Sequence, residues 1–255
     1  MAAADNFVLV TGGLSGIGAA AAIALAADGF TPIIADIATT SDSQAPDGCI
    51  LWRTPLDVSD EGSVTAAVEA IEAERGPIGG LVNAAGILGK MHRPERLKMA
   101  DWDREMAVDL RGTYLMCRAV GSRMAARGAG AIVNVASVVG TASAPVHGYG
   151  PAKAAVINLT ATLAAEWGPR GVRVNAISPG FTRTPALERA FEAGALSRQR
   201  MEGAAALHRL VEPGEVGRAI AWLIGPSSSA ITGINLPVDA GFLAAMGWQP
   251  YGGLR

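Results

Sequence analysis

Residues 11–18 read Thr-Gly-Gly-Leu-Ser-Gly-Ile-Gly, and they join a short apolar run at 7–10 directly to an alanine-rich stretch at 16–28. A strand that turns on glycines straight into a helix is typical of a loop that holds a dinucleotide pyrophosphate. The first glycine permits the tight turn, Gly16 and Gly18 let the backbone approach the phosphates, and the helix N-terminus adds partial positive charge. An ordinary strand–helix turn is the other interpretation, because glycine is common here (32 residues). The expected contacts from this loop are Gly12, Leu14, Ser15, Gly16, Ile17 and Gly18.

Short apolar runs alternate with alanine-rich helical stretches along the chain. The runs that read as strands are 7–10, 31–35, 49–54, 79–83, 131–136, 172–177 and 234–238. The stretches that read as helices are 16–28, 60–75, 102–127, 148–167 and 213–224. This order implies βαβ units, and strands that are apolar throughout require burial on both faces. The sequence therefore predicts an α/β, Rossmann-like, doubly wound fold, with a mostly parallel seven-stranded sheet and helices on both faces.

The 255 residues fall within the range in which α/β proteins form one unit, so we expect a single domain over 1–255. Residues 185–210 interrupt the regular alternation. An insertion there would cover the carboxyl ends of the strands, where open α/β sheets bind ligands. Aromatic residues gather in the tail at 242–255, which we expect at a subunit interface.

Composition argues against several classes of partner. The net charge is −2 and no basic block is present, so neither nucleic acid nor a membrane surface is an expected partner. The segment 1–5 is short and lacks the basic residues of a signal peptide, which predicts a cytoplasmic protein. Cys49 and Cys117 have apolar neighbours and belong to no CxxC motif, which indicates reduced core thiols and no metal site.

Tyr149 and Lys153 are spaced four residues apart in a predicted helix, so their side chains lie on the same face. A cation beside a phenol favours the phenolate, which makes the tyrosine a better proton donor and acceptor near neutral pH. Proton exchange beside a bound dinucleotide indicates hydride chemistry at a carbonyl or carbinol carbon.

An acidic residue, Asp36, follows the second predicted strand. A carboxylate there accepts hydrogen bonds from the adenosine ribose and repels a 2′-phosphate, and no basic residue at Ser15 or Ile37 offsets the repulsion. The sequence therefore predicts NAD rather than NADP. Asp57, followed by Val58, is placed either to accept a hydrogen bond from the adenine amino group or to cap the next helix.

With these residues in view, the chain resembles the short-chain dehydrogenase/reductase family, in its short single-domain branch. The resemblance covers nearly the whole chain, and the order and spacing of its motifs are more specific than any one of them. The motifs are Thr11-Gly-Gly-Leu-Ser-Gly-Ile-Gly18, Asn83-Ala-Ala-Gly86, Ser137, Tyr149-Gly-Pro-Ala-Lys153, Val174-Asn175 and Pro179-Gly180 through Thr184. The resemblance implies an NAD(H)-dependent oxidoreductase that interconverts a secondary alcohol and its ketone. It also implies a homotetramer with interfaces built from the helices at 102–127 and 148–167.

The resemblance assigns a role to each catalytic candidate. Tyr149 would be the general acid in reduction and the base in oxidation, Lys153 would hold the nicotinamide ribose, and Ser137 would donate to the substrate oxygen. Ser137 precedes the tyrosine by twelve residues, one fewer than is usual in the family, which indicates a variation of the pocket. The remaining cofactor contacts that the resemblance implies are Asn83, Ala84, Gly86, Pro179, Gly180, Thr182 and Thr184.

One position departs from the family pattern. Asp109 stands where the family usually has an asparagine whose main-chain carbonyl positions a water that relays protons to the lysine. A carbonyl does not depend on its side chain, so we expect Asp109 to serve as a fourth catalytic residue. Pro151 must lie in the first turn of its helix, where its missing N–H has no cost.

The substrate is left open by the sequence. Leu88, Val139, Pro145, His147 and Phe181 are expected to line the pocket together with 185–210, and His92 is a further polar candidate. A sugar, a polyol or another small alcohol is favoured, with a 3-oxoacyl or steroid reductase as an alternative. From a different class, a dinucleotide-binding regulator without turnover would keep the same fold. A dehydratase or epimerase is a third possibility, although such relatives usually carry a longer substrate domain.

Overall fold

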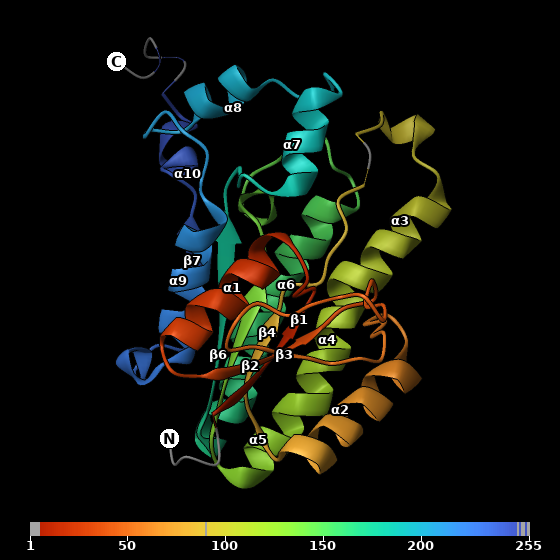
Figure 1. The fold of residues 1–255 in the computed structure, drawn as a ribbon. Coiled ribbons are helices and arrows are strands. Elements are labelled where there is room, and N and C mark those ends of the chain that lie inside the picture. The colour runs from red at the N-terminus through yellow and green to blue at the C-terminus, as the bar shows by residue number, and fades with distance from the viewer. Residues whose placement is uncertain (1–5, 90, 249, 251–252, 254–255) are drawn as a thin grey trace.

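Seven parallel strands form one sheet at the centre of the molecule, in the order β3-β2-β1-β4-β5-β6-β7. The computed structural model describes residues 6–89, 91–248, 250 and 253. The strands are β1 (Phe7–Thr11), β2 (Thr31–Ala35), β3 (Ile50–Leu51), β4 (Ile78–Asn83), β5 (Gly130–Val135), β6 (Val172–Pro179) and β7 (Asn235–Val238). The predicted α/β fold with a doubly wound parallel sheet is confirmed (Figure 1).

Helices cover both faces of the sheet, because neighbouring strand residues point to opposite sides. Val8 and Val10 pack with α1 (Gly16–Ala27) and α9 (Pro213–Ile224) on one face. Leu9, between them, packs on the other face with α2 (Glu61–Arg75) and α6 (Tyr149–Trp167). Each of these three strand residues is fully buried, which explains why the strands read as continuous apolar runs.

A continuous helix runs from Met99 to Arg127 beside α6, and its winding changes along its length. It begins three residues before the predicted start at 102. Two π-helical turns interrupt it, so some of its hydrogen bonds reach one residue further than in an α-helix. Its segments are α3 (Met99–Glu105), the π-helical η3 (Met106–Gly112), α4 (Thr113–Met116), the π-helical η4 (Cys117–Gly121) and α5 (Ser122–Arg127).

Strand β3 is much shorter than the predicted 49–54, and the prediction of a six-residue strand is wrong. Trp52 still donates its backbone N–H to the carbonyl of Ile34 (2.8 Å), and the chain then leaves the sheet edge. Strand β6 extends two residues beyond its predicted end, through Pro179.

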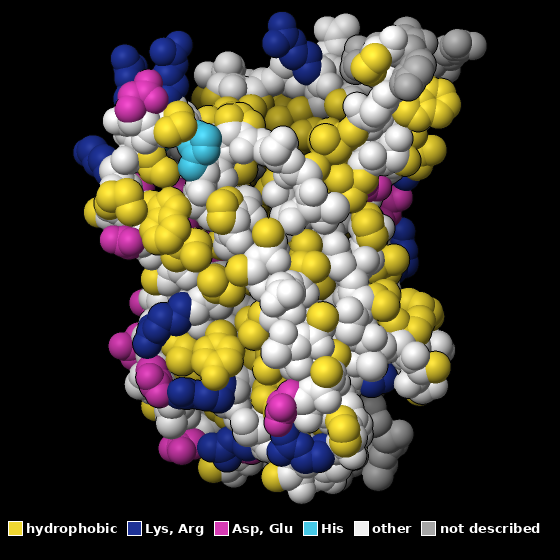
Figure 2. Space-filling view, turned by 180° about the vertical axis from the view of Figure 1, so that it is seen from behind, with side chains coloured by type: hydrophobic (Ala, Val, Ile, Leu, Met, Phe, Trp, Pro, Cys, Tyr) yellow, Lys and Arg dark blue, Asp and Glu magenta, His cyan; other side chains and the backbone are white. Residues whose placement is uncertain are grey.

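The stretch at 185–210 contains α7 (Pro185–Glu192) and α8 (Arg198–Ala204). Both lie at the end of the sheet toward which the arrow of β6 points, as does α10 (Phe242–Ala245) (Figure 1). From the opposite side, hydrophobic side chains gather at this same end (Figure 2). The stretch therefore lies over the carboxyl ends of the strands. The remaining short helices are η2 (Pro94–Arg96), η5 (Val138–Gly140), η6 (Gly168–Arg170) and η7 (Pro226–Ser228).

Candidate active site

The glycine loop packs tightly against the segment that follows β4. Gly12 has a positive φ of 64°, and a Cβ there would lie 2.8 Å from the backbone of Ala85. A Cβ on Gly18 would overlap the carbonyl oxygen of Gly12, so this glycine lets the first turn of α1 pack on the loop itself. Ser15 is exposed and its side chain does not cap α1. The N-terminus of α1 therefore keeps backbone N–H groups directed out of the loop.

Asp36 is tied to the glycine loop through its carboxylate. Its Oδ2 accepts a hydrogen bond from Leu14 N (3.2 Å), and its Oδ1 accepts one from Ala38 N (2.9 Å). Two backbone donors thus fix the orientation of the negative charge beside the loop. The next residue, Ile37, is uncharged and 64% exposed, so it places no positive charge beside the carboxylate.

Asp57 forms a turn rather than a helix cap. Its Oδ1 accepts hydrogen bonds from Ser59 N (2.9 Å) and Ser59 Oγ (2.7 Å). The cap of α2 is Asp60, which accepts from Ser63 N (2.6 Å), so the helix-cap interpretation of Asp57 is wrong. Val58 is buried against Gly112, where a Cβ would come within 2.8 Å of its Cγ2.

The structure brings the tyrosine and the lysine together at the start of α6. Tyr149 is the first residue of that helix and is partly exposed. Lys153 is buried, its Nζ lies 5.4 Å from the centre of the Tyr149 ring, and it donates to the carbonyl of Val135 (3.0 Å). Ser137 follows β5 and accepts a hydrogen bond from Val139 N (3.4 Å). Pro151 lies in the first turn of α6, as predicted.

Asp109 is fully buried in the π-helical segment η3, and its side chain reaches the lysine directly. Its Oδ1 lies 3.2 Å from Lys153 Nζ and accepts from Ile87 N (3.2 Å). Its main-chain carbonyl accepts from Thr113 Oγ1 (2.9 Å). Burial raises the pKa of the Asp109 carboxyl, and the ion pair with Lys153 offsets part of that rise. The carboxylate contacts the lysine, while the carbonyl is already engaged by a hydroxyl.

Gly86 leaves room for this ion pair. A Cβ on Gly86 would lie 2.6 Å from Asp109 Oδ1 and 3.4 Å from Lys153 Nζ. Ala84, two residues earlier, is partly buried.

Asn83 directs its side chain into a buried polar chain. Its Nδ2 donates to Asn134 Oδ1 (2.8 Å) and to Cys117 Sγ (3.2 Å), and Asn134 in turn donates to Thr160 Oγ1 (3.0 Å). Burial raises the pKa of the Cys117 thiol to about 12, so this thiol stays protonated. Neither Asn134 nor Thr160 is among the predicted site residues. An asparagine inside an apolar strand was the available signal for the first of them.

The segment after β6 crosses to the glycine loop. Gly180 lies against Asp239, whose Cα would be 2.7 Å from a Cβ on that glycine. Thr182 donates its hydroxyl to the carbonyl of Gly180 (3.0 Å). Thr184 caps α7 by accepting from Leu187 N (3.3 Å), and its methyl lies 3.4 Å from where Gly16 would carry a Cβ. Pro179 ends β6 at the same edge.

Asn175, in β6, bridges two backbone groups of the segment before β7. It donates to the carbonyl of Ile231 (2.9 Å) and accepts from Ile234 N (3.3 Å). Phe242, in the C-terminal tail, packs edge-on against Phe181 at 5.0 Å between ring centres. Tyr251 lies outside the described residues.

Glu105 is a buried carboxyl that its sequence context does not predict, because a glutamate in a polar helix usually faces solvent. It is 4% exposed and lies beside Gly89 and Gly148, next to Tyr149.

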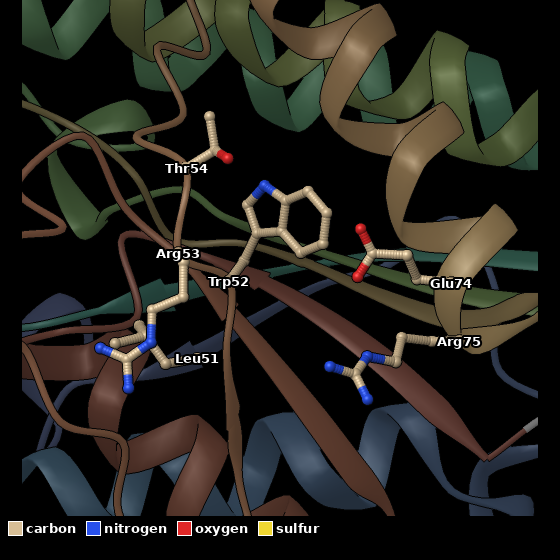
Figure 3. Close-up of a pocket in the computed structure, with 6 residues that line it drawn as sticks. All are labelled: Leu51, Trp52, Arg53, Thr54, Glu74 and Arg75. Atoms are coloured by element: carbon tan, nitrogen blue, oxygen red, sulfur yellow. The ribbon is translucent and has the colours of Figure 1, made fainter. Parts of the chain in front are cut away.

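A cavity of about 150 Å³ lies away from these groups, at the β3 edge of the sheet (Figure 3). Its lining is mostly polar and includes none of the predicted site residues. The lining residues are Leu51, Trp52, Arg53, Thr54, Glu74 and Arg75. Arg53 donates to the carbonyl of Ser43 (2.8 Å) in the neighbouring loop. Among the described residues, no group of three or more His, Cys, Asp or Glu side chains is arranged to bind a metal ion. Within the residues that the structure describes, no helix is both long and apolar enough to span a bilayer.

The chain matches the family model described as Enoyl-(Acyl carrier protein) reductase over residues 12–243. It is 38% identical over 250 residues to a D-threitol dehydrogenase of Mycolicibacterium smegmatis (strain ATCC 700084 / mc(2)155), covering 92% of this chain and 91% of that protein. The chain belongs to the short-chain dehydrogenase/reductase family. It is also 39% identical over 250 residues to a cis-4-hydroxycyclohexanecarboxylate dehydrogenase of Sinomonas cyclohexanicum, covering 94% of this chain and 98% of that protein. This short-chain dehydrogenase/reductase is thus an oxidoreductase that acts on an alcohol or its ketone, as predicted.

Solved structures extend the comparison. One described as ribose-5-phosphate isomerase from Brucella melitensis 16M is 48% identical, with a TM-score of 0.94 over 99% of this chain and 98% of that one. Another, ElxO with NADP bound, is 28% identical, with a TM-score of 0.86 over 94% of this chain and 99% of that one. The family thus binds a nicotinamide dinucleotide, which is NADP in this neighbour, and the reactions named for its members differ.

Proposed function

We propose that this chain is an NAD(H)-dependent dehydrogenase that interconverts a secondary hydroxyl of a polyol or cyclic alcohol and the corresponding ketone. The observation that carries the proposal is the buried Lys153 ammonium, 5.4 Å from the Tyr149 ring and held by a carbonyl and a carboxylate. An ammonium fixed beside a phenol stabilises the phenolate that must take the proton from an alcohol. The names of the threitol and hydroxycyclohexanecarboxylate dehydrogenases support the substrate class.

The residues present fit a nicotinamide dinucleotide. The uncapped N-terminus of α1 suits a pyrophosphate, and Asp36, held by Leu14 N, suits an adenosine ribose. Asp57, Val58, Asn83, Ala84 and the 179–184 segment would complete the site. A 2′-phosphate beside the Asp36 carboxylate would be repelled, which supports NAD over NADP.

The chain's own groups would divide the chemistry between them. The nicotinamide ring supplies or accepts the hydride. In oxidation, the Tyr149 phenolate takes the hydroxyl proton while the carbinol C–H bond breaks, and Ser137 donates a hydrogen bond to the substrate oxygen. In reduction, the Tyr149 hydroxyl returns a proton to that oxygen as charge develops on it. Lys153 holds the ribose, and Asp109 holds Lys153.

A substrate panel tests the proposal. Tetritols, pentitols and cyclic secondary alcohols, and their ketones, would be assayed with both nicotinamide cofactors by the absorbance of the reduced ring. We expect turnover with NAD, and a loss of about 10²–10⁴-fold in Tyr149→Phe with dinucleotide binding retained. Tyr114→Phe, at an exposed tyrosine of α4, is the matched control. If the chain binds a dinucleotide but turns over none of the alcohols or ketones in the panel, the regulatory alternative is favoured instead.

An isomerase is the competing function, because the 48% identical structure is described as one. Isomerisation of a sugar phosphate produces no net change in cofactor absorbance and needs a phosphate site. Arg183, which lies within the 179–184 segment, is engaged by Glu188 (3.8 Å) and Glu212 (3.2 Å). Converting ribose 5-phosphate to ribulose 5-phosphate at constant absorbance would overturn the dehydrogenase proposal.

For the assembly, we retain a homotetramer in the cytoplasm as part of the proposal. The long helices at 99–127 and 149–167 would form its interfaces, and Trp248, 53% exposed, would contribute to a contact of the tail. Sedimentation at working concentration measures this directly, and a monomer would rule it out.

A further inference from the structure

Glu105 is a buried carboxyl that the proposed chemistry does not use. It is the last residue of α3 and is 4% exposed. It lies one turn before Asp109 on the same continuous helix, and α3 packs beside α6 at this point. An ionisable group is seldom taken this far out of water unless specific contacts hold it.

Two glycines make room for its carboxyl group. A Cβ on Gly89 would overlap Glu105 Oε1, and a Cβ on Gly148 would overlap Glu105 Oε2. Neither glycine has a positive φ, so conformational freedom does not explain the absence of side chains there. The carboxyl fills the space between two backbone segments that are far apart in the sequence.

Both segments belong to the proposed active site. Gly89 follows Leu88, and Gly148 stands between His147 and Tyr149; Leu88 and His147 are predicted pocket residues. Burial raises the pKa of the Glu105 carboxyl, the nearby backbone amide of Tyr149 offsets part of that rise, and Asp109 and Asp101 add to it. The positive end of α6, a helix of 19 residues, also favours a carboxylate at this place.

We propose that Glu105 is a positioning residue that ties the loop at Gly89 to the N-terminus of α6 and thereby fixes the backbone from which Tyr149 extends. Its effect on turnover rests on the proposed dehydrogenase function, whereas its effect on the backbone does not. Glu105 would not exchange a proton with the substrate. It would set the distance between the two walls of the pocket and the aim of the Tyr149 hydroxyl.

Kinetics of four single variants, one of them a control, and one double variant test the role. Glu105→Gln keeps the shape and an acceptor oxygen for the Tyr149 amide, so we expect kcat to stay within about threefold of the parent. Glu105→Ala frees both segments, and we expect kcat to fall by about tenfold or more, with KM for NAD changed less than about twofold. Glu95→Ala, at an exposed glutamate of η2, is the control for the loss of a charge from this region.

A double-mutant cycle separates this role from simple packing. Gly148→Ala places a methyl group against Glu105 Oε2, so we expect it to lower kcat as Glu105→Ala does. In the Glu105→Ala background the carboxyl is gone while Trp102 Cδ1, 3.3 Å from the new methyl group, remains, so we expect a much smaller further loss. Equal losses from Gly148→Ala in both backgrounds would overturn the proposal.

Amide hydrogen exchange decides the matter even if the chain turns over no alcohol. We expect exchange at 146–150 and 86–89 to accelerate at least about tenfold in Glu105→Ala, and to stay near the parent rate in Glu105→Gln. Unchanged exchange in Glu105→Ala would refute the positioning role. An inactive parent that nevertheless shows the expected exchange would refute only the dehydrogenase function.

Discussion

Asp109 Oδ1 lies 3.2 Å from Lys153 Nζ, and both side chains are buried. The lysine of the proposed catalytic group therefore has an anionic partner within the protein, besides the carbonyl of Val135. A carboxylate at this distance balances the ammonium before any ligand enters, and the removal of one partner would leave a buried charge without compensation.

The burial of the Asp109 carboxyl predicts a dependence of stability on pH. Burial raises the pKa of the Asp109 carboxyl, so the folded state holds this proton more tightly than the unfolded chain does. Such a group stabilises the fold most at low pH, and the contribution is lost as the pH rises through the folded-state pKa. We expect the melting temperature of Asp109→Asn, relative to the parent, to increase from about pH 4 upwards. Asp103→Asn, at an exposed site on α3, should show no such trend. A difference in melting temperature between Asp109→Asn and the parent that stays constant with pH would contradict the expectation.

The glycine loop predicts a contrast between two glycine-to-alanine changes. At Gly18 the new methyl group meets the backbone carbonyl of Gly12, which cannot rotate away, so we expect a loss of about 1–3 kcal/mol and weaker NAD binding. At Gly203, in α8, nothing lies within 4 Å of the new methyl group. There we expect a gain of about 0.5–1 kcal/mol from better helix formation. Chemical denaturation and dinucleotide titration measure both, and equal effects would mean that the loop tolerates a side chain.

We expect the choice between NAD and NADP to depend on the charge of Asp36. Asp36→Asn keeps an acceptor for Leu14 N and removes the charge at the proposed site of the adenosine ribose. We expect the ratio of kcat/KM for NADP to that for NAD to rise about tenfold or more. Asp28→Asn, at the exposed end of α1, should leave the ratio unchanged. A parent that already prefers NADP would show that Asp36 does not set the choice.

The start of α9 predicts an acid-sensitive contribution to stability. Arg209 forms two hydrogen bonds with Glu215 (2.7 and 2.8 Å) and, with the backbone N–H of Glu212, lowers the pKa of Glu215 from 4.5 to about 2. A lowered carboxyl pKa stabilises the fold above the ordinary value, and the effect disappears as the pH falls toward 2. Both side chains are partly exposed, so Glu215→Gln should cost about 1 kcal/mol or less at neutral pH. At pH 2 it should match the parent, and Glu192→Gln, at an exposed glutamate of α7, should be neutral at both pH values.

The fold was predictable because its strongest signals are local. Glycines 12, 16 and 18 stand between a strand and a helix, and the buried strands are apolar throughout because α1 and α9 cover one face and α2 and α6 the other. The length of β3 was not predictable, since it depends on where the edge strand stops pairing with β2. The cap of α2 was also not predictable, because Asp57 and Asp60 are both acidic. Only the structure shows that the backbone N–H of Ser63 donates to Asp60.

The candidate site was predicted as a set of residues and only partly as a geometry. Tyr149 and Lys153 lie together because helical spacing determines it. The sequence directs attention to the main-chain carbonyl of Asp109, whereas the structure turns the carboxylate toward the lysine and gives the carbonyl to Thr113. Side-chain direction in a π-helical turn follows from its hydrogen bonding, which has no simple sequence signal. Glu105 was missed because its signal is divided between two glycines that are distant in the sequence.

Asp109 lies in the seven-residue π-helical segment η3. The direction of its side chain therefore depends on the winding of the helix as well as on its own contacts. Each residue of an α-helix advances by about 100° around the axis, so a one-residue deletion in this turn that restored α-helical winding would swing the carboxylate off the lysine. Such a deletion would break the ion pair between Asp109 and Lys153, although Ser137, Tyr149 and Lys153 would all remain in the chain. We therefore expect insertions and deletions around 106–112 to lower activity more than most substitutions there.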